Sequence, residues 1–236
     1  MPRSRWFGSF LISILVFVAS IGASAQVQNR SALQAKMESL RAQIQAKEKV
    51  FLAPSAEDIA DFAQFLSQPD TGIARLMPRE TYDGKLLIRG GGSLYSFTRL
   101  SHNYGLGSDI GLERGQLSVG FAGSDFGFLT SLGNAAIDGV TAEQPGVSFL
   151  VEFKSPSTEA EARLQQRRAE IGFAEQGFMY RSSLAATVSS TYALRSVSYG
   201  TSDVLVVFRV IRQDSDGSLT LVWKILKLFP VPQFVQ

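Results

Sequence analysis

Thr191 to Phe229 is the stretch that decides the fold, and its sequence is TYALRSVSYGTSDVLVVFRVIRQDSDGSLTLVWKILKLF. Valine, leucine, isoleucine and aromatic residues dominate three runs, and residues that favour turns separate these runs. Such runs are typical of antiparallel β-strands that are joined by short turns. The stretch therefore predicts a three-stranded β-meander.

The second turn of this meander sets the pairing of its last two strands. Closing the turn over Asp214 to Gly217 pairs Gln213 with Ser218, and every pair farther from the turn follows from that one. One face of the meander is then a continuous apolar slab, whereas the other is amphipathic and is expected to lie under a helix. The register places Phe208 opposite Trp223, Val206 opposite Ile225 and Val210 opposite Leu221.

The segment Ile88 to Gly133 is rich in glycine, and twelve of the chain's 21 glycines lie between Gly84 and Gly133. Glycine adopts backbone conformations that other residues avoid, so it gathers at turns and at close approaches between backbones. The pattern Gly-Ser-Asp-x-Gly occurs at Gly107–Gly111 and again at Gly123–Gly127. We expect the two copies to form successive turn-and-strand units of one antiparallel sheet.

Further strands are expected within and around this segment. Leu86–Arg89 and Leu94–Leu100 have the composition of short strands, and Leu117, Val119 and Phe121 alternate as one face of another. The apolar run Val147–Phe153 is compatible with either a strand or a turn of helix.

Two further helices are expected outside the glycine-rich segment, an amphipathic one before it and a charged one after it. The first runs from Glu57 to Leu66, and Ser55 with Asp58 matches the pattern of a capping box at its start. The second runs from Thr158 to about Ile171, and Thr158 with Glu161 matches the same pattern. The expected apolar face of the first helix consists of Ile59, Phe62, Phe65 and Leu66.

The N-terminus has the layout of a secretory signal peptide. Arg3 and Arg5 precede an apolar run from Phe7 to Ile21, which is followed by Ala23-Ser24-Ala25. Small residues at this spacing are typical of a cleavage site, and the run is shorter than the roughly 20 residues that span a bilayer. We therefore expect residues 1–25 to be removed on export to the periplasm or the extracellular space, with a retained membrane anchor as the alternative.

Residues 26–52 are expected to form a helical extension. Leu33, Met37, Leu40 and Ile44 recur at spacings of four, three and four, so they form one narrow apolar stripe. Such a stripe can pair with another helix in a short coiled coil, although Lys47 interrupts the repeat. The alternatives are self-association through residues 31–51 and docking of this helix on its own domain.

Charge and cysteine content exclude several classes of function. Without Arg3 and Arg5, 21 basic residues remain against 21 acidic ones, so no nucleic-acid partner is predicted. The chain contains no cysteine, which excludes zinc–thiolate sites and thiol catalysis. No motif predicts a metal or a cofactor, and no membrane span is expected in the mature chain.

Arg99, His102, Asp109 and Asp125 are the candidate ligand-binding residues of the glycine-rich segment. His102 is the only histidine, and the two aspartates come from the two Gly-Ser-Asp copies. If the two aspartates lie side by side in the fold, they could supply oxygen ligands for a hard cation. Alternatively, the histidine could form a hydrolytic triad with a serine and an aspartate. However, the chain has no Gly-x-Ser-x-Gly nucleophile elbow, and turns select aspartate and glycine for their own reasons.

Taken together, these patterns predict an α+β fold, a predominantly antiparallel β-sheet with flanking helices and an N-terminal helical extension. Residues 53–236 are expected to form a single domain that ends in the β-meander. The expected function is that of an exported, non-catalytic binding or structural protein, because no catalytic constellation stands out. A binder of a small ligand or cation at residues 88–133 is the alternative, and a hydrolase using His102 is a further one.

Export by this route predicts a defined N-terminus. If the signal peptide is removed after Ala25, protein recovered from the periplasm or the medium of producing cells begins at Gln26. Intact-mass measurement and N-terminal sequencing test this directly. Recovery of folded, exported protein that still begins at Met1 would contradict the prediction.

Overall fold

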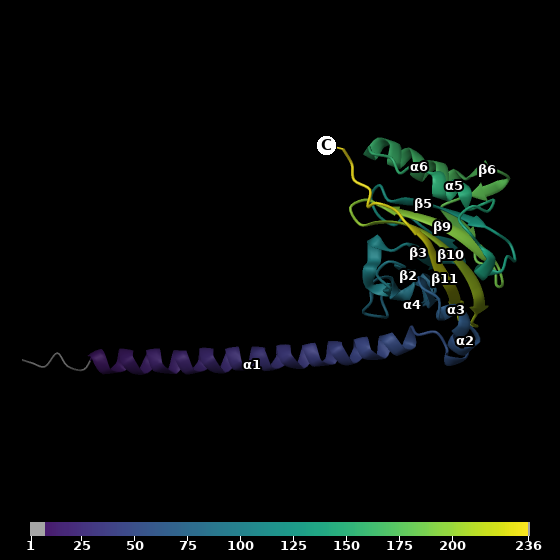
Figure 1. The fold of residues 1–236 in the computed structure, drawn as a ribbon. Helices are drawn as coiled ribbons and strands as arrows, with labels where there is room; N and C mark the ends of the chain where they lie inside the picture. The colour runs from purple at the N-terminus through teal and green to yellow at the C-terminus, as the bar shows by residue number, and fades with distance from the viewer. Residues whose placement is uncertain (1–7, 236) are drawn as a thin grey trace, which may run out of the picture. The chain divides into compact units, whose positions relative to one another are not determined.

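A computed structural model describes the backbone of residues 8–235 and the side chains of residues 29–235, apart from those at positions 103 and 106. Within this part of the chain, the long helix α1 (Gly8–Phe51) is followed by short helices and strands (Figure 1). The chain divides into two units, Met1–Lys47 and Glu48–Gln236. The second unit therefore includes the last turn of α1, and it contains all the strands that the structure describes.

The helices after α1 are short, with the exception of α6. They are α2 (Ala56–Asp61), α3 (Ala63–Leu66), α4 (Arg79–Tyr82), α5 (Ser148–Glu152) and α6 (Glu159–Ile171). Segments of 3₁₀ helix occur at Arg89–Gly92, His102–Gly107 and Ile137–Gly139.

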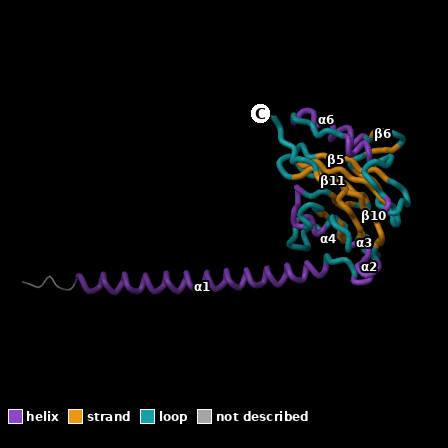
Figure 2. The backbone as a smooth tube through the Cα atoms, in the orientation of Figure 1, coloured by secondary structure: helices purple, strands orange, loops and turns teal. Residues whose placement is uncertain are grey.

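The main sheet is built on the C-terminal meander (Figure 2). Its five strands are antiparallel and follow the order β1-β11-β10-β9-β5. They are β1 (Thr71–Leu76), β5 (Phe126–Ser131), β9 (Thr191–Ser198), β10 (Ser202–Gln213) and β11 (Leu219–Leu228). Together with its flanking helices, this sheet confirms the α+β fold expected from the sequence.

Two smaller antiparallel sheets accompany the main one. A four-stranded sheet has the order β2-β3-β4-β8, and β6 pairs with β7 in a two-stranded sheet. The strands are β2 (Leu94–Tyr95), β3 (Ile110–Glu113), β4 (Gln116–Ser118), β6 (Phe173–Glu175), β7 (Phe178–Tyr180) and β8 (Ser183–Ala185).

The meander pairs as expected from Val206 to Val210, but a register shift beyond Val206 pairs Leu205 with Lys227. The three expected pairs are present, Phe208 with Trp223, Val206 with Ile225 and Val210 with Leu221. Beside the turn the expected pairing is wrong, because Gln213 pairs with Leu219 and not with Ser218. The register shifts between Val210 and Arg212, where one extra residue forms a β-bulge that the sequence pattern does not reveal.

Both faces of the main sheet are buried, each against a different layer (Figure 1). On one face, Val206, Phe208 and Trp223 pack in a core that includes buried residues of the four-stranded sheet. On the other face, Leu205 and Val207 belong to a second core, to which α5 and α6 contribute. This arrangement confirms the apolar slab and the helical cover of the opposite face.

The strands expected at the start of the glycine-rich segment are largely absent. Leu86–Arg89 is not a strand and instead leads into the 3₁₀ segment Arg89–Gly92, where the three glycines have positive φ angles. The strand expected over Leu94–Leu100 ends at Tyr95, because the chain reverses and Ser96 bridges to Ser101. Left-handed glycines and a reversal of this kind end an extended strand.

Close packing requires two of these glycines. A Cβ atom at Gly91 would lie 2.5 Å from the backbone of Tyr82, and one at Gly92 would lie 2.4 Å from a side-chain carbon of Leu52. Leu52 directly follows α1, and Tyr82 ends α4. The triple glycine therefore allows both helix ends to approach the segment closely.

The two Gly-Ser-Asp copies lie in different sheets, so the expectation of one common sheet is wrong. The copy at 107–111 leads into β3 of the four-stranded sheet, and the copy at 123–127 leads into β5 of the main sheet. Each copy introduces a strand, as expected. Between the copies, β4 pairs with β3, and the chain then crosses from one sheet to the other.

The two helices expected on either side of the glycine-rich segment are present with one change. The Oγ of Ser55 accepts a hydrogen bond from the backbone N–H of Asp58 at 3.0 Å, but the helix divides at Phe62 into α2 and α3, and Ile59 is exposed. Thr158 caps α6 as the sequence predicts. The ambiguous run Val147–Phe153 contains the helix α5.

Residues 31–51 are helical as expected, since they lie within α1. The side chains of its apolar stripe, Leu33, Met37, Leu40 and Ile44, are between 44% and 55% exposed. Residues 1–7 and the side chains of the apolar run up to Ile21 lie outside the described residues. Among the residues that are described, no helix is both long enough and apolar enough to cross a bilayer.

Trp223 lies at the centre of the first core and predicts a large effect on stability. It is 3% exposed, its ring lies 5.4 Å from that of Phe97, and Gly72 on β1 leaves room for the indole. Because truncation of a large buried aromatic residue costs about 3–5 kcal/mol, Trp223→Ala should sharply lower the melting temperature. Differential scanning calorimetry measures this.

The matched control is Lys227→Ala, because Lys227 is an exposed residue of the same strand. We expect the control to melt within a few degrees of the wild type, since exposed substitutions usually change stability by less than about 0.5 kcal/mol. Equal melting temperatures for the two variants would show that Trp223 does not support the core.

Candidate functional site

Asp109, a candidate ligand-binding residue, is fully buried. Its Oδ2 accepts hydrogen bonds from the hydroxyl of Ser96 at 3.0 Å and from the backbone N–H of Phe97 at 2.8 Å. Burial raises the pKa of Asp109, while these hydrogen bonds act in the opposite direction. The carboxyl group thus holds the reversal after β2 in place from within the protein.

Asp125 has a different set of partners. Its Oδ1 accepts a hydrogen bond from the backbone N–H of Tyr199, in the turn between β9 and β10, at 3.0 Å. Burial raises the pKa of this carboxyl group as well. The neighbouring Ser124 donates to Glu159 of α6 at 3.1 Å, so the second Gly-Ser-Asp copy joins the main sheet to this helix.

His102 is turned toward the main sheet. Its Nε2 lies 2.7 Å from the backbone carbonyl oxygen of Arg75 on β1, and its ring centroid lies 5.0 Å from that of Tyr95. Because a carbonyl oxygen only accepts hydrogen bonds, Nε2 is the donor. Burial lowers the pKa of His102, partly offset by this hydrogen bond, which favours the neutral imidazole.

Arg99 lies on the surface, and its guanidinium group is 5.0 Å from the centre of the Tyr104 ring. Its backbone N–H donates to the Oγ of Ser96, the same hydroxyl that donates to Asp109. Three of the four candidates, Arg99, His102 and Asp109, are thus held around the reversal after β2, whereas Asp125 is held by the β9–β10 turn. No group of three or more histidine, aspartate or glutamate side chains in the described part of the chain is placed to hold a metal ion.

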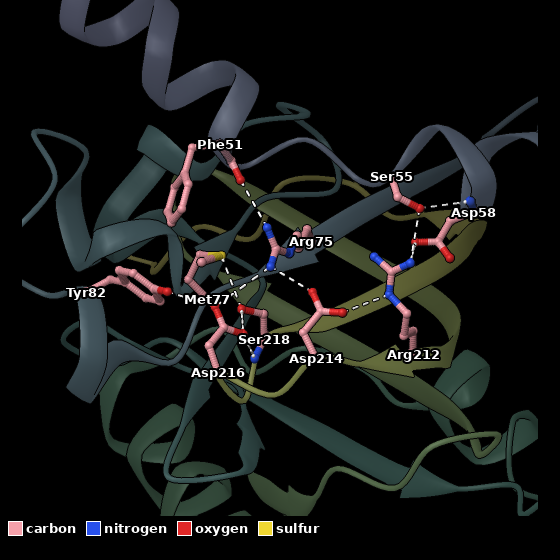
Figure 3. Close-up of polar contacts among 10 residues, drawn as sticks. All are labelled: Phe51, Ser55, Asp58, Arg75, Met77, Tyr82, Arg212, Asp214, Asp216 and Ser218. Atoms are coloured by element: carbon pink, nitrogen blue, oxygen red, sulfur yellow. Dashed lines mark hydrogen bonds and ion pairs between the residues drawn. The ribbon is translucent and has the colours of Figure 1, made fainter.

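A polar cluster joins the Asp214–Gly217 turn to β1 and α2 (Figure 3). Arg75 Nη2 lies 2.7 Å from Asp214 Oδ2, and Arg212 lies 2.9 Å from both Asp214 and Asp58. Guanidinium groups and carboxylates therefore alternate along the cluster. The Arg75 cluster, as we name it, consists of Phe51, Ser55, Asp58, Arg75, Met77, Tyr82, Arg212, Asp214, Asp216 and Ser218.

The carboxylate of Asp216 completes the cluster. The Tyr82 hydroxyl donates to its Oδ2 at 2.7 Å, and the backbone N–H of Ser218 donates to its Oδ1 at 2.9 Å. Burial raises the pKa of Asp216, but the hydrogen bonds from Ser218 and Tyr82 outweigh burial and leave this pKa below its ordinary value. This acidic turn is therefore neutralised by protein groups, as expected of a structural ion-pair network.

The Arg75 cluster also holds the C-terminal end of α1. Arg75 Nη1 donates to the backbone carbonyl of Phe51 at 3.2 Å, which satisfies one of the carbonyls left unpaired at a helix end. The adjoining Glu48 and Leu52 are 5% and 6% exposed, and Glu48 accepts a hydrogen bond from the backbone N–H of Leu87. We refer to residues 48–52 as the helix root.

A groove of about 510 Å³ lies between residues 151–157 and 227–233. The buried pair Arg195 and Asp203 contributes to its lining. Exposed lysines at positions 154 and 227 line it as well, as do Pro156, Pro230 and Pro232. None of the four residues predicted from the sequence to bind a ligand lines this groove.

Arg195 has a structural role beside this groove. Its Nε and Nη2 donate to the two carboxylate oxygens of Asp203, each at 2.9 Å. Its Nη1 donates to the backbone carbonyls of Leu150 and Phe153 at the end of α5, and Nη2 also contacts Ser155. Every N–H of the guanidinium group thus has a protein partner, so Arg195 positions α5 and offers no free donor to a ligand.

Sequence reasoning did not identify the Arg75 cluster or the Arg195–Asp203 pair. For Arg195 a signal existed, because an arginine within an apolar strand run needs a buried partner of opposite charge. For Arg75 no local signal existed, since its partner Asp214 lies 139 residues away and β1 itself was not expected.

The chain was also compared with known proteins. No protein-family model, no curated protein and no solved structure matches it. The function must therefore be inferred from the residues of the chain itself.

The partly buried imidazole of His102 predicts a pH dependence of stability. Because burial lowers its pKa below the ordinary value of 6.5, the unfolded chain binds the proton more readily than the folded chain. The contribution of the neutral His102 side chain to stability is therefore present above about pH 6.5, and it is lost as the pH falls below 6.5. His102→Gln keeps a donor for the Arg75 carbonyl but cannot titrate, so thermal melts should show a smaller loss of stability for the variant between about pH 8 and about pH 5.

Both proteins are measured in the same buffers. The raised pKa values of Asp109 and Asp125 contribute a pH dependence of the opposite sign, and they contribute it equally to wild type and variant. The difference between the two melting curves therefore isolates His102. An identical pH dependence in both proteins would rule out the proposed contribution of this histidine.

Proposed function

We propose that the chain is an exported, non-catalytic protein that acts through binding or assembly, with the helix α1 as its contact surface. The observation that carries this proposal is the exposed apolar stripe of Leu33, Met37, Leu40 and Ile44. Large apolar side chains at coiled-coil spacing gain stability when they are buried against a second helix.

The helix root supports this function because it stabilises the end of the helix. Starting a helix is costly, since several residues must be ordered before the first hydrogen bond forms. Glu48 and Leu52 are buried, and Arg75 bonds to the carbonyl of Phe51, so the last turn of α1 is ordered by the domain. A helix with one ordered end needs no separate nucleation there, which favours helical structure in the residues that carry the stripe.

The partners of the other candidate residues favour this function over a ligand site at residues 88–133. Asp109 is bonded to Ser96 and Phe97, Asp125 to Tyr199, and His102 to Arg75. A site for a small ligand or cation would need these groups to exchange their protein partners for the ligand.

Export to the periplasm or the extracellular space is part of the proposal and rests on the sequence of residues 1–25. The stripe has two candidate occupants. A second copy of the chain would give self-association through residues 31–51, and a helix of a different protein would give a mixed complex.

Site-specific photocrosslinking in producing cells tests the proposed contact surface. A photoreactive phenylalanine analogue at position 40 lies on the stripe, whereas one at position 42 lies on nearly the opposite side of the same helix. Both positions are exposed, so they form a matched pair. We expect covalent protein adducts from position 40 and none from position 42.

The mass of the adduct distinguishes the occupants, because a second copy doubles the mass of the chain. Absence of adducts from positions 33, 37, 40 and 44 alike would contradict the proposal. Equal adducts from positions 40 and 42 would contradict it as well, since contact would then not depend on the stripe.

A further inference from the structure

We propose that the occupant of the stripe is a helix of a different protein, with acidic residues along both edges of its apolar face. This inference rests on the proposed function, since it names the partner of the same surface. The observation that carries it is the placement of the basic residues on α1.

All the basic residues between positions 30 and 47 border the stripe. A helix turns by about 100° per residue, so all four lie within about 70° of the stripe's centre. Arg30 and Lys47 extend the stripe at its two ends. Lys36 and Arg41 lie along its opposite edges.

The only carboxylate of the same segment lies away from the stripe. Glu38 is about 130° from its centre and accepts a hydrogen bond from Gln34 at 3.1 Å. The stripe is therefore an apolar seam framed by positive charge, although the mature chain as a whole is expected to be neutral. All these charged side chains are exposed and available to a partner.

A second copy of α1 fits this frame poorly. In a parallel coiled coil, the residue that directly precedes a seam position on one helix faces the residue five places later on the other helix. Lys36 of one copy would therefore face Arg41 of the second copy. In an antiparallel pair that matches Leu33 with Ile44, the ends of the seam set Arg30 against the second copy's Lys47. Like charges meet in both arrangements, and such juxtapositions are unfavourable.

An acidic helix reverses the sign of each of these contacts. Glutamates at the edge positions of the partner would meet Lys36 and Arg41, and acidic residues beyond its apolar segment would meet Arg30 and Lys47. The narrowness of the stripe also favours a helix over a membrane surface. Its four residues span about 60°, which is the width of a coiled-coil seam, whereas a helix that lies in a bilayer interface buries a wider apolar face.

The probe for this inference is a synthetic helical peptide with leucine at its seam positions and glutamate along both edges. Binding to the exported protein is measured by fluorescence anisotropy at low and high salt. We expect binding that weakens as salt increases, because exposed charge pairs are screened. Reversing both edge charges, Lys36→Glu with Arg41→Glu, should lower the affinity by about tenfold or more.

The matched control is Lys85→Glu with Lys154→Glu, which changes the net charge equally at exposed positions outside α1. We expect the control to bind the peptide as the wild type does. Leu40→Asp should abolish binding, because it places a charge inside the seam.

Three results would overturn the inference. None of them replaces the photocrosslinking experiment, which tests the proposed function separately. The first is failure of the acidic peptide to bind, or equal binding of a peptide with lysine along its edges. The second is a light-scattering mass of two chains that falls to one chain with Leu40→Asp. The third is binding to vesicles that contain phosphatidylglycerol, lost with Leu40→Asp, without binding to the peptide.

Discussion

Burial of β10 on both faces is the constraint on which the rest of the structure depends. From Ser202 to Val210, every residue of this strand except Arg209 is buried. A strand in this position must pair on both edges and must be covered on both faces, because its backbone and its side chains are removed from water. The strands β9 and β11 supply the edges, and the four-stranded sheet and the helices α5 and α6 supply the two covers.

Arginines on strands fasten helices to this framework in two separate places. Arg195 on β9 bonds to the carbonyls of Leu150 and Phe153 at the end of α5, and Arg75 on β1 bonds to the carbonyl of Phe51 at the end of α1. In both places the last carbonyls of a helix lack intrahelical partners, and a cation beside them is favoured by the helix dipole. Each arginine is also paired with an aspartate, which offsets the cost of removing its charge from water.

The sequence predicted the parts of the fold that depend on local pattern. Alternation identified the meander and the Phe208–Trp223 pair, and capping residues identified the starts of α2 and α6. It missed β1, because Gly72 and Arg75 weaken the strand pattern and the pairing with β11 joins distant parts of the chain. The candidate site was underdetermined for the same reason, since the partner of His102 lies on that missing strand.

The glycine-rich segment and the N-terminal helix are separate features in the sequence, yet they meet in the structure. The absence of a side chain at Gly92 makes room for Leu52, and the absence of one at Gly91 lets the backbone of Tyr82 approach. Tyr82 in turn packs its ring 5.4 Å from that of Phe51, at the helix root. These glycines are therefore needed to seat the end of α1. This packing explains the conformations of the glycines, whereas the apolar stripe of α1 stays exposed in the described part of the chain, with basic residues around it.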